Sequence, residues 1–303
     1  MLCPSVDHYP SEDEKLRASK LSRRRGGNCP NSLEVLQQLV EVSQSDLSLG
    51  LMTVLPKRQS HSTAFIRDSL GPSVDCDNCV YREDTSEPAS CYVIQSQQTG
   101  SRTIVNYNGL SEMTFEEFKT CVGQTELENC WFHFEGRIPD TTLKCLQFLR
   151  RTQPSVQISV ELEKPGRAGL DKLAAEADLV FYAKGWAQAC GYKSMEECLR
   201  SQSRVTPKAK YLFCTWGEDG AALLTRSDST CISVPALKIA DSEVVDTIGA
   251  GDTFIAGIFF GLLCHYDEWE WARKLRFANE LAGRKVVQEG FQGLGQVMTR
   301  QMR

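Results

Sequence analysis

Short apolar segments alternate with amphipathic stretches of helical length from residue 128 to the hairpin that follows residue 217. The expected strands are residues 130–136, 156–163, 178–183 and 210–217, and the expected helices are residues 141–152, 169–177 and 194–202. Strands that alternate with helices favour right-handed βαβ units, in which helices cover both faces of a parallel sheet. The sequence therefore predicts an α/β fold with a doubly wound, mostly parallel sheet.

The first third of the chain has a different pattern. Residues 32–42 have helical spacing, with Leu33, Leu36, Leu39 and Val40 on one face. Residues 79–84, 90–97 and 101–108 are typical of antiparallel strands, and Gly100 lies in the turn between the last two. We expect a single domain over residues 1–303, to which residues 79–108 add a small antiparallel β lid or dimer sheet.

Composition argues against several kinds of partner. The 303-residue chain has a formal net charge of −5, so it lacks the basic footprint of a nucleic-acid-binding protein. No apolar run reaches the ~18 residues of a membrane span, and the N-terminus lacks the pattern of a signal peptide. Thirteen scattered cysteines, with no second pair to join Cys76 and Cys79, are typical of reduced thiols rather than a zinc site. We expect a cytoplasmic protein with no nucleic-acid or membrane partner.

The segment DTIGAGD, residues 246–252, separates Val244–Val245, interpreted as the end of an apolar strand, from an apolar helix that begins near Phe254. Small residues at a helix N-terminus let backbone amides converge on an anion, where the helix dipole also favours negative charge. Such amides can stabilise a transferring phosphoryl group, and Asp252 can accept the proton of an attacking hydroxyl. The alternative is a glycine-rich turn with Asp252 as an ordinary first-turn residue.

A second cluster of small and polar residues, RRRGGNCPNS, occupies residues 23–32. The Gly26–Gly27 pair allows a ligand to approach the backbone, and the amides of Asn28 and Asn31 can bind hydroxyl groups. The alternative is a helix turn capped by Asn31 or Ser32. The sequence contains no G-x-G-x-x-G, G-K-[ST], G-x-S-x-G or H-E-x-x-H motif, which disfavours dinucleotide oxidoreductases, P-loop proteins, esterases and zinc proteases.

Taken together and in this order, the two clusters resemble the ribokinase (PfkB) family of carbohydrate kinases. The segments VDHYPSEDEK, TGSRTIVNY, FHFEGR and ISVELEKP are similar to its ketohexokinase branch. The resemblance implies Asp252 as the catalytic base and an anion hole at Gly249, Ala250 and Gly251. It further implies sugar contacts at Asp13, Gly27, Asn28 and Asn31, and ATP contacts at Arg102, Gly217, Glu218, Asp219, Gly220 and Asn279.

The activity that this resemblance implies is transfer of the γ-phosphoryl group of ATP to a hydroxyl of a ketose, with fructose as the expected substrate. Mg²⁺ is expected to be carried by the nucleotide phosphates rather than by a dedicated protein site. Glu161 and Glu163 either hold that ion through water or form the polar end of a strand. A homodimer is expected through the strands of residues 79–108. The alternatives are a kinase of another small alcohol, such as ribose, adenosine or inositol, and a non-catalytic nucleotide or sugar binder.

The N-terminus departs from the family pattern. Family members begin with an apolar strand that ends near a sugar-binding aspartate, whereas residues 1–4 of this chain align beyond that strand. The absent strand would lie inside the parallel sheet, where unpaired buried backbone groups cost ~1–3 kcal/mol each. Three explanations stay open: an incomplete version of a normal kinase, a fold with a gap and weak activity, or a non-catalytic relative.

Overall fold

The computed structural model describes residues 1–124 and 127–302, which form two compact units. Unit 1 consists of Met1–Gly27 and Leu51–Glu112. Unit 2 consists of Asn28–Gly50 and the described part of Met113–Arg303, and it contains most of the chain.

A six-stranded sheet in the order β14-β13-β12-β11-β10-β9 forms the centre of unit 2. Its strands are β9 (Trp131–Glu135), β10 (Gln157–Leu162), β11 (Leu179–Tyr182), β12 (Tyr211–Thr215), β13 (Ala221–Thr225) and β14 (Cys231–Val234). The first four are mutually parallel, and β13 and β14 add to them as an antiparallel hairpin. The mostly parallel sheet predicted from the sequence is therefore confirmed, with strand ends within two residues of those expected.

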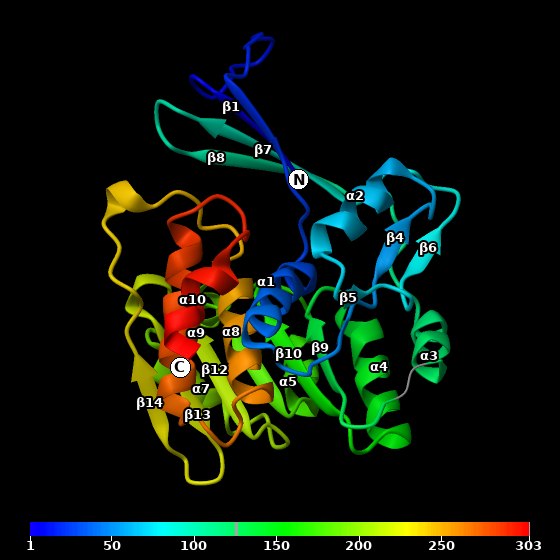
Figure 1. Cartoon of the computed structure of the whole chain (residues 1–303), viewed down its shortest axis with the longest axis vertical. Coiled ribbons are helices and arrows are strands. Elements are labelled where there is room, and N and C mark those ends of the chain that lie inside the picture. The colour runs from blue at the N-terminus through cyan, green and yellow to red at the C-terminus, as the bar shows by residue number, and fades with distance from the viewer. Residues whose placement is uncertain (125–126, 303) are drawn as a thin grey trace. The chain divides into compact units, whose positions relative to one another are not determined.

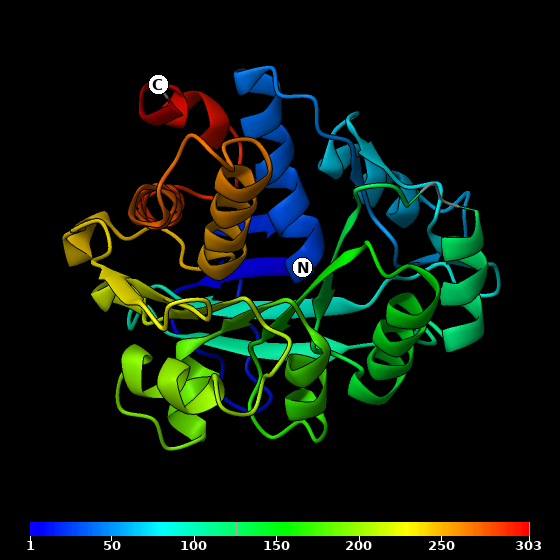
Figure 2. The same cartoon turned by 90° about the horizontal axis from the view of Figure 1, so that it is seen from below.

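Helices cover both faces of this sheet (Figures 1 and 2). One face carries α1 (Asn28–Ser43), α8 (Ala250–Leu263), α9 (Trp271–Val286) and α10 (Leu294–Met302). The other carries α4 (Pro139–Thr152), α5 (Leu170–Glu176), α6 (Lys184–Ala189) and α7 (Met195–Gln202), while α3 (Phe115–Gly123) packs beside α4. The short strand β3 (Leu49–Gly50) follows α1, and single 3₁₀ turns occupy Gly217–Asp219 and Asp241–Glu243. The arrangement is doubly wound, as predicted.

Burial explains why β10, β11 and α8 lie in the core of unit 2. All four residues of β11 and the last five of β10 are buried, as expected for parallel strands covered on both faces. Helix α8 is buried without interruption from Asp252 to Leu262, so it lies inside the core instead of on its surface. At Gly257 a Cβ atom would lie 2.7 Å from the Cα atom of Ala278, and the missing side chain lets α8 and α9 approach closely.

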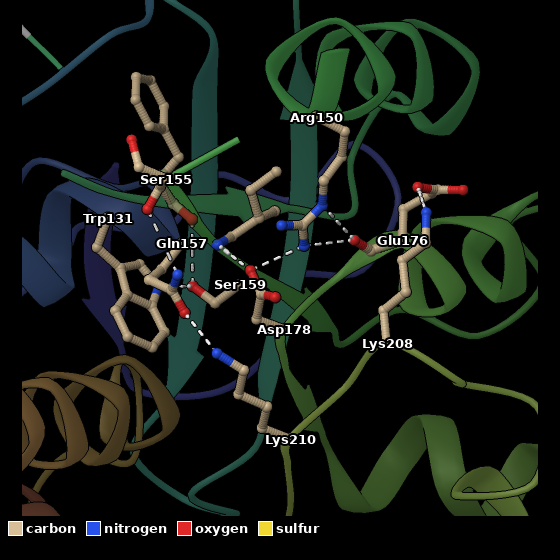
Figure 3. Close-up of polar contacts among 11 residues, drawn as sticks. Trp131, Arg150, Ser155, Gln157, Ser159, Glu176, Asp178, Lys208 and Lys210 are labelled. Atoms are coloured by element: carbon tan, nitrogen blue, oxygen red, sulfur yellow. Dashed lines mark hydrogen bonds and ion pairs between the residues drawn. The ribbon is translucent and has the colours of Figure 1, made fainter. Parts of the chain in front are cut away.

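The amino-terminal ends of the parallel strands are joined by a polar network centred on Asp178, which comes directly before β11 (Figure 3). One carboxylate oxygen of Asp178 accepts hydrogen bonds from the Ile158 amide and from Arg150, each at 2.8 Å. Arg150 also donates to the carbonyl of Glu176 at 2.8 Å. These contacts tie the amino-terminal ends of β10 and β11 to the end of α4.

Unit 1 contains a four-stranded sheet in the order β2-β1-β7-β8. Its strands are β1 (Leu2–Val6), β2 (Lys20–Arg23), β7 (Ser90–Ser96) and β8 (Arg102–Tyr107). The antiparallel β7–β8 hairpin was predicted, and Gly100 takes the positive φ of 67° that its turn requires. The remaining elements of this unit are β4 (Val54–Pro56), α2 (His61–Leu70), β5 (Val74–Asp75) and β6 (Val80–Arg82).

Several local predictions were wrong. Residues 79–84 do not join the antiparallel sheet, because β6 within them pairs in parallel with β4. Helix α1 begins at Asn28 instead of residue 32, so Asn31 lies inside its first turn and is not a cap. Val244 and Val245 end no strand: they follow a 3₁₀ turn and are exposed.

The N-terminal residues pair as β1 with β2 and β7 inside unit 1. Among the described strands of the six-stranded sheet, β9 pairs only with β10 and is therefore an edge strand. Over residues 1–124 and 127–302, no helix has both the length and the apolar character needed to cross a bilayer.

Candidate active site

The first turns of α1 and α8 meet in unit 2, because the two helices pack against each other. The amide nitrogen Nδ2 of Asn31 donates to Oδ2 of Asp252 at 2.7 Å, and both side chains are buried, with 5% and 6% of their surface exposed. The Ser32 hydroxyl donates to the backbone carbonyl of Asp252 at 3.0 Å. Two motifs that lie far apart in the sequence thus form one site, and its carboxylate is held at both side chain and backbone.

The backbone before Asp252 has a conformation that suits anion binding. Gly249 precedes α8 in the left-handed region, with φ of 80°, and a Cβ atom there would lie 2.4 Å from the Phe291 ring. Gly251 is exposed, and a Cβ atom on it would meet nothing within 4 Å. Amides in a first helical turn lack intrahelical partners and lie at the positive end of the dipole. The Ala250 amide donates to the Thr247 carbonyl at 3.3 Å. The exposed Gly251 is therefore the most accessible backbone position of this segment beside Asp252.

Asn28 connects the start of α1 to the end of β10. Its Nδ2 donates to Oε2 of Glu161 at 3.0 Å and to Oε2 of Glu163 at 3.1 Å. Glu161 is buried, and burial is the main cause that raises its pKa to about 8, with the charge of Asp252 acting in the same direction. Glu161 therefore keeps a proton through most of the neutral range, which reduces charge repulsion around Asp252.

Two other titratable groups near the site are unsuited to proton transfer or nucleophilic attack. Burial lowers the pKa of His133 on β9 to about 4, and its Nδ1 atom forms a hydrogen bond with the Ser159 hydroxyl at 2.9 Å. The neutral ring packs edge-on against Phe259. Burial raises the pKa of the Cys29 thiol far above its usual range, so that thiol stays protonated and unreactive. Asp252, in contrast, is a carboxylate held by hydrogen bonds at both its side chain and its backbone carbonyl.

The predicted ATP loop lies between β12 and β13. Glu218 and Asp219 are exposed in its 3₁₀ turn. Gly220 has φ of 97°, and a Cβ atom on it would lie 2.1 Å from the Val234 carbonyl oxygen. Asn279 on α9 donates to that same oxygen at 2.8 Å and to the Pro235 carbonyl oxygen at 3.2 Å. The structure thus brings Gly217–Gly220 and Asn279 to a shared segment, and the Asn279 amide serves to fix that segment.

Three predicted site residues belong to unit 1. Asp13 is exposed in the loop between β1 and β2, with φ of 62°. Gly27 directly precedes Asn28 in the chain and has φ of 101°. Arg102 is the exposed first residue of β8. Their roles in binding sugar and ATP remain predictions.

Sequence reasoning missed two contributions to the site. It treated Ser32 only as a possible helix cap, whereas its hydroxyl holds the Asp252 backbone. It also left Glu161 undecided, because alternation along a strand shows which face a residue takes but not how deeply that face is buried. Among the described residues, no group of three or more His, Cys, Asp or Glu side chains is arranged to hold a metal ion.

Both the sequence and the fold of this chain are similar to those of known carbohydrate kinases. Residues 3–294 match the family described as "pfkB family carbohydrate kinase". Ketohexokinase of Mus musculus is 33% identical over 297 residues, which is 95% of this chain and 93% of the mouse protein. Ribokinase of Thermotoga maritima has a similar fold, with a TM-score of 0.75 at 16% identity over 97% of this chain and 91% of that one. Arabidopsis thaliana ribokinase, solved with ribose and ATP, gives a TM-score of 0.74 at 16% identity over 100% and 95% of the two chains.

The raised pKa of Glu161 predicts a pH-dependent stability that Glu161→Gln removes. Between the ordinary glutamate pKa of 4.5 and the raised pKa of about 8, the native chain keeps a proton that the unfolded chain releases. The free energy of unfolding should therefore fall as pH rises through this window, by at most about 1.4 kcal/mol per pH unit. Urea unfolding of Glu161→Gln across the window should show a shallower fall than the wild type. Glu163→Gln removes one of the neighbouring charges that raise the Glu161 pKa, so its slope should lie between those of the wild type and Glu161→Gln. Equal slopes for all three proteins would contradict the prediction.

Proposed function

We propose that this chain, which belongs to the pfkB family of carbohydrate kinases, transfers the γ-phosphoryl group of ATP to a hydroxyl of a ketose, with fructose as its substrate. As a carbohydrate kinase it is a phosphotransferase with an alcohol acceptor. The observation that carries the proposal is the Asp252 carboxylate, held 2.7 Å from the Asn31 amide beside the first-turn backbone of α8. The choice of fructose is supported by the 33% identity to mouse ketohexokinase.

In the proposed mechanism, Asp252 orients the acceptor hydroxyl and accepts its proton as the reaction begins. The hydroxyl oxygen forms a bond to the γ-phosphorus, and the bond from that phosphorus to the β–γ bridging oxygen breaks, so that ADP leaves. Charge that develops on the transferring group is stabilised by the backbone amides of Gly249–Gly251 at the start of α8. The hydrogen bond from Asn31 keeps the carboxylate aligned for the proton transfer.

The residues present fit a magnesium ion that is bound mainly through nucleotide phosphates. Mg²⁺ keeps several water ligands and commonly takes only one or two carboxylates from a protein. The Glu163 carboxylate and the protonated Glu161 side chain, which share the Asn28 amide, are the groups that would contact its water ligands. When bound, the ion would neutralise charge on the phosphates.

The remaining predicted contacts complete this proposal. Asn28 and Asn31 bind sugar hydroxyls together with Asp13 and Gly27. The ATP contacts are Arg102, the loop Gly217–Gly220 and Asn279. Residues 79–108 contribute the small β lid or dimer sheet of the predicted kinase domain. ATP and reduced thiols are both available in the cytoplasm, where we place the protein.

Asp252→Asn tests the role of the base. The amide oxygen of the new side chain can still accept the hydrogen bond from Asn31, so the fold should persist, but the side chain can no longer take a proton. Turnover with fructose, measured as ADP release, should fall by at least about 100-fold. ATP binding, measured by calorimetry, should persist. Asp267→Asn, an exposed aspartate between α8 and α9, is the matched control, and turnover of Asp252→Asn within threefold of the wild type would remove Asp252 from this role.

A panel of acceptors tests the substrate. With D-fructose, D-ribose, adenosine and inositol as acceptors and ADP release as the readout, kcat/KM should be highest for fructose. Preference for another member of the panel would reassign the protein as a kinase of that alcohol. Calorimetric binding of ATP or sugar without any phosphoryl transfer would instead identify a non-catalytic binder.

A homodimer is also part of the proposal, because β8 exposes several apolar side chains. Ile104, Val105 and Tyr107 are 53%, 55% and 57% exposed, and β8 is the last strand of its sheet. An edge strand with exposed apolar residues is an unusual surface for a monomer. We therefore propose that this hairpin pairs with a second copy of the chain.

The dimer should dissociate when a charge is placed on this strand. Size-exclusion chromatography with light scattering should give twice the chain mass for the wild type and the chain mass for Val105→Asp, since an interface would have to bury the new charge. Val205→Asp, at an equally exposed valine of unit 2, should remain dimeric. A wild type that elutes at the mass of one chain would refute the dimer.

A further inference from the structure

We propose that Lys285 is a positioning residue, which fixes the loop before α8 and thereby aligns the backbone amides of the anion hole. The inference rests on the proposed kinase function, since it assigns a task within that same site. Lys285 lies near the end of α9 and is fully buried, with 0% of its surface exposed. It is not among the residues that contact the substrate, and it acts through the loop that precedes Gly249.

The Lys285 ammonium group is surrounded by oxygen atoms. Its Nζ atom donates to Oδ2 of Asp246 at 2.7 Å, to the Asp246 carbonyl oxygen at 3.0 Å and to the Gln288 carbonyl oxygen at 3.4 Å. An ammonium group has three N–H donors, so three oxygens satisfy it. The Phe291 ring lies on another side, with its centroid 5.4 Å from Nζ. The Lys285 charge is thus bound to the loop at Asp246, through both its side chain and its carbonyl oxygen.

Further contacts carry this anchoring toward the anion hole. The second carboxylate oxygen of Asp246, Oδ1, accepts a hydrogen bond from the Ile248 amide at 3.1 Å. The amides of Val245 and Asp246 donate to the Val286 carbonyl at 2.9 and 3.0 Å. The Phe291 ring that lies beside Lys285 also packs against Gly249, where no side chain would fit. The end of α9 therefore holds the loop at its start, and Phe291, five residues beyond that helix, packs against its last residue.

The placement of this charge pair is better explained by positioning than by stability. Moving two charges from water into the interior is costly, and a buried ion pair is weak evidence that a fold needs it for stability. Asp246, the loop member of the pair, lies four residues before Ala250, the first residue of α8. A displacement of about 1 Å in groups that stabilise a transition state can lower a rate about 100-fold. A fixed loop at this point therefore has a functional consequence that a pair elsewhere in the core would lack.

Lys274 offers a matched comparison on the same helix. It is 3% exposed, and its Nζ atom donates to the carbonyl oxygens of Tyr266 and Trp269. These partners lie beyond the far end of α8, away from the anion hole. Lys274→Met and Lys285→Met thus each remove a buried ammonium from α9, and only the second acts on the loop.

The experiment compares these two variants below their unfolding temperatures. Lys285→Met should lower kcat with fructose by about 10- to 100-fold and change KM for fructose by less than about threefold. It should also weaken binding of a non-hydrolysable ATP analogue more than binding of ADP, measured by calorimetry. Lys274→Met should keep kcat within threefold of the wild type, even where its unfolding temperature falls as far.

A second variant keeps the test decisive if the methionine variant does not fold. Lys285→Ala leaves a space that a small primary ammonium ion can enter, so added propylammonium should raise its kcat, and tetramethylammonium, which has no N–H donor, should not. A Lys285→Met protein with normal kcat and an unchanged preference for the ATP analogue over ADP would overturn the positioning role alone. A wild type that transfers phosphate to no acceptor and binds no nucleotide would overturn the proposed function and this inference together.

Discussion

The hydrogen bond between the Asn31 amide and the Asp252 carboxylate joins two helix N-termini whose residues are 221 positions apart in the chain. The packing of α1 against α8 makes this contact possible, and the Ser32 hydroxyl strengthens it through the Asp252 backbone. Because both helices begin at the same place, two positive dipole ends and two sets of first-turn amides point toward one region. A negative charge at Asp252 is stabilised there, and so is an anionic ligand beside it.

The surrounding charges limit what this region can do. Glu161, Glu163 and Asp252 bring three carboxyl groups together, and a cluster of this kind would repel an anion if all three were ionised. Burial raises the Glu161 pKa, and the Asn28 amide donates to both glutamates, so the negative charge that remains is smaller than the count of carboxyl groups suggests. His133 and Cys29 add no charge because desolvation lowers the pKa of the imidazole and raises that of the thiol, which keeps both neutral.

Local sequence patterns predicted much of the fold and the centre of the site. The alternation of strands and helices after residue 128 was confirmed because apolar periodicity is a property of neighbouring residues. The helix predicted after DTIGAGD is α8, which begins at Ala250. Partners distant in sequence were not predictable in this way: residues 80–82 have the composition of a strand, and nothing in them indicates parallel pairing with β4. Lys285 looks like one of several basic residues at the end of an amphipathic helix, and only the tertiary structure shows that it is buried against Asp246.

Helix α8 is buried without interruption from Asp252 to Leu262, so the Asp252 carboxylate is part of the protein interior and not of an exposed surface segment. Volume changes at Ile255 or Phe259, which many cores absorb by small shifts of a helix, would here move the acid along with the helix that carries it. A substitution in this segment that preserves folding can therefore still displace the Asp252 carboxylate, to which the proposed function assigns the proton transfer.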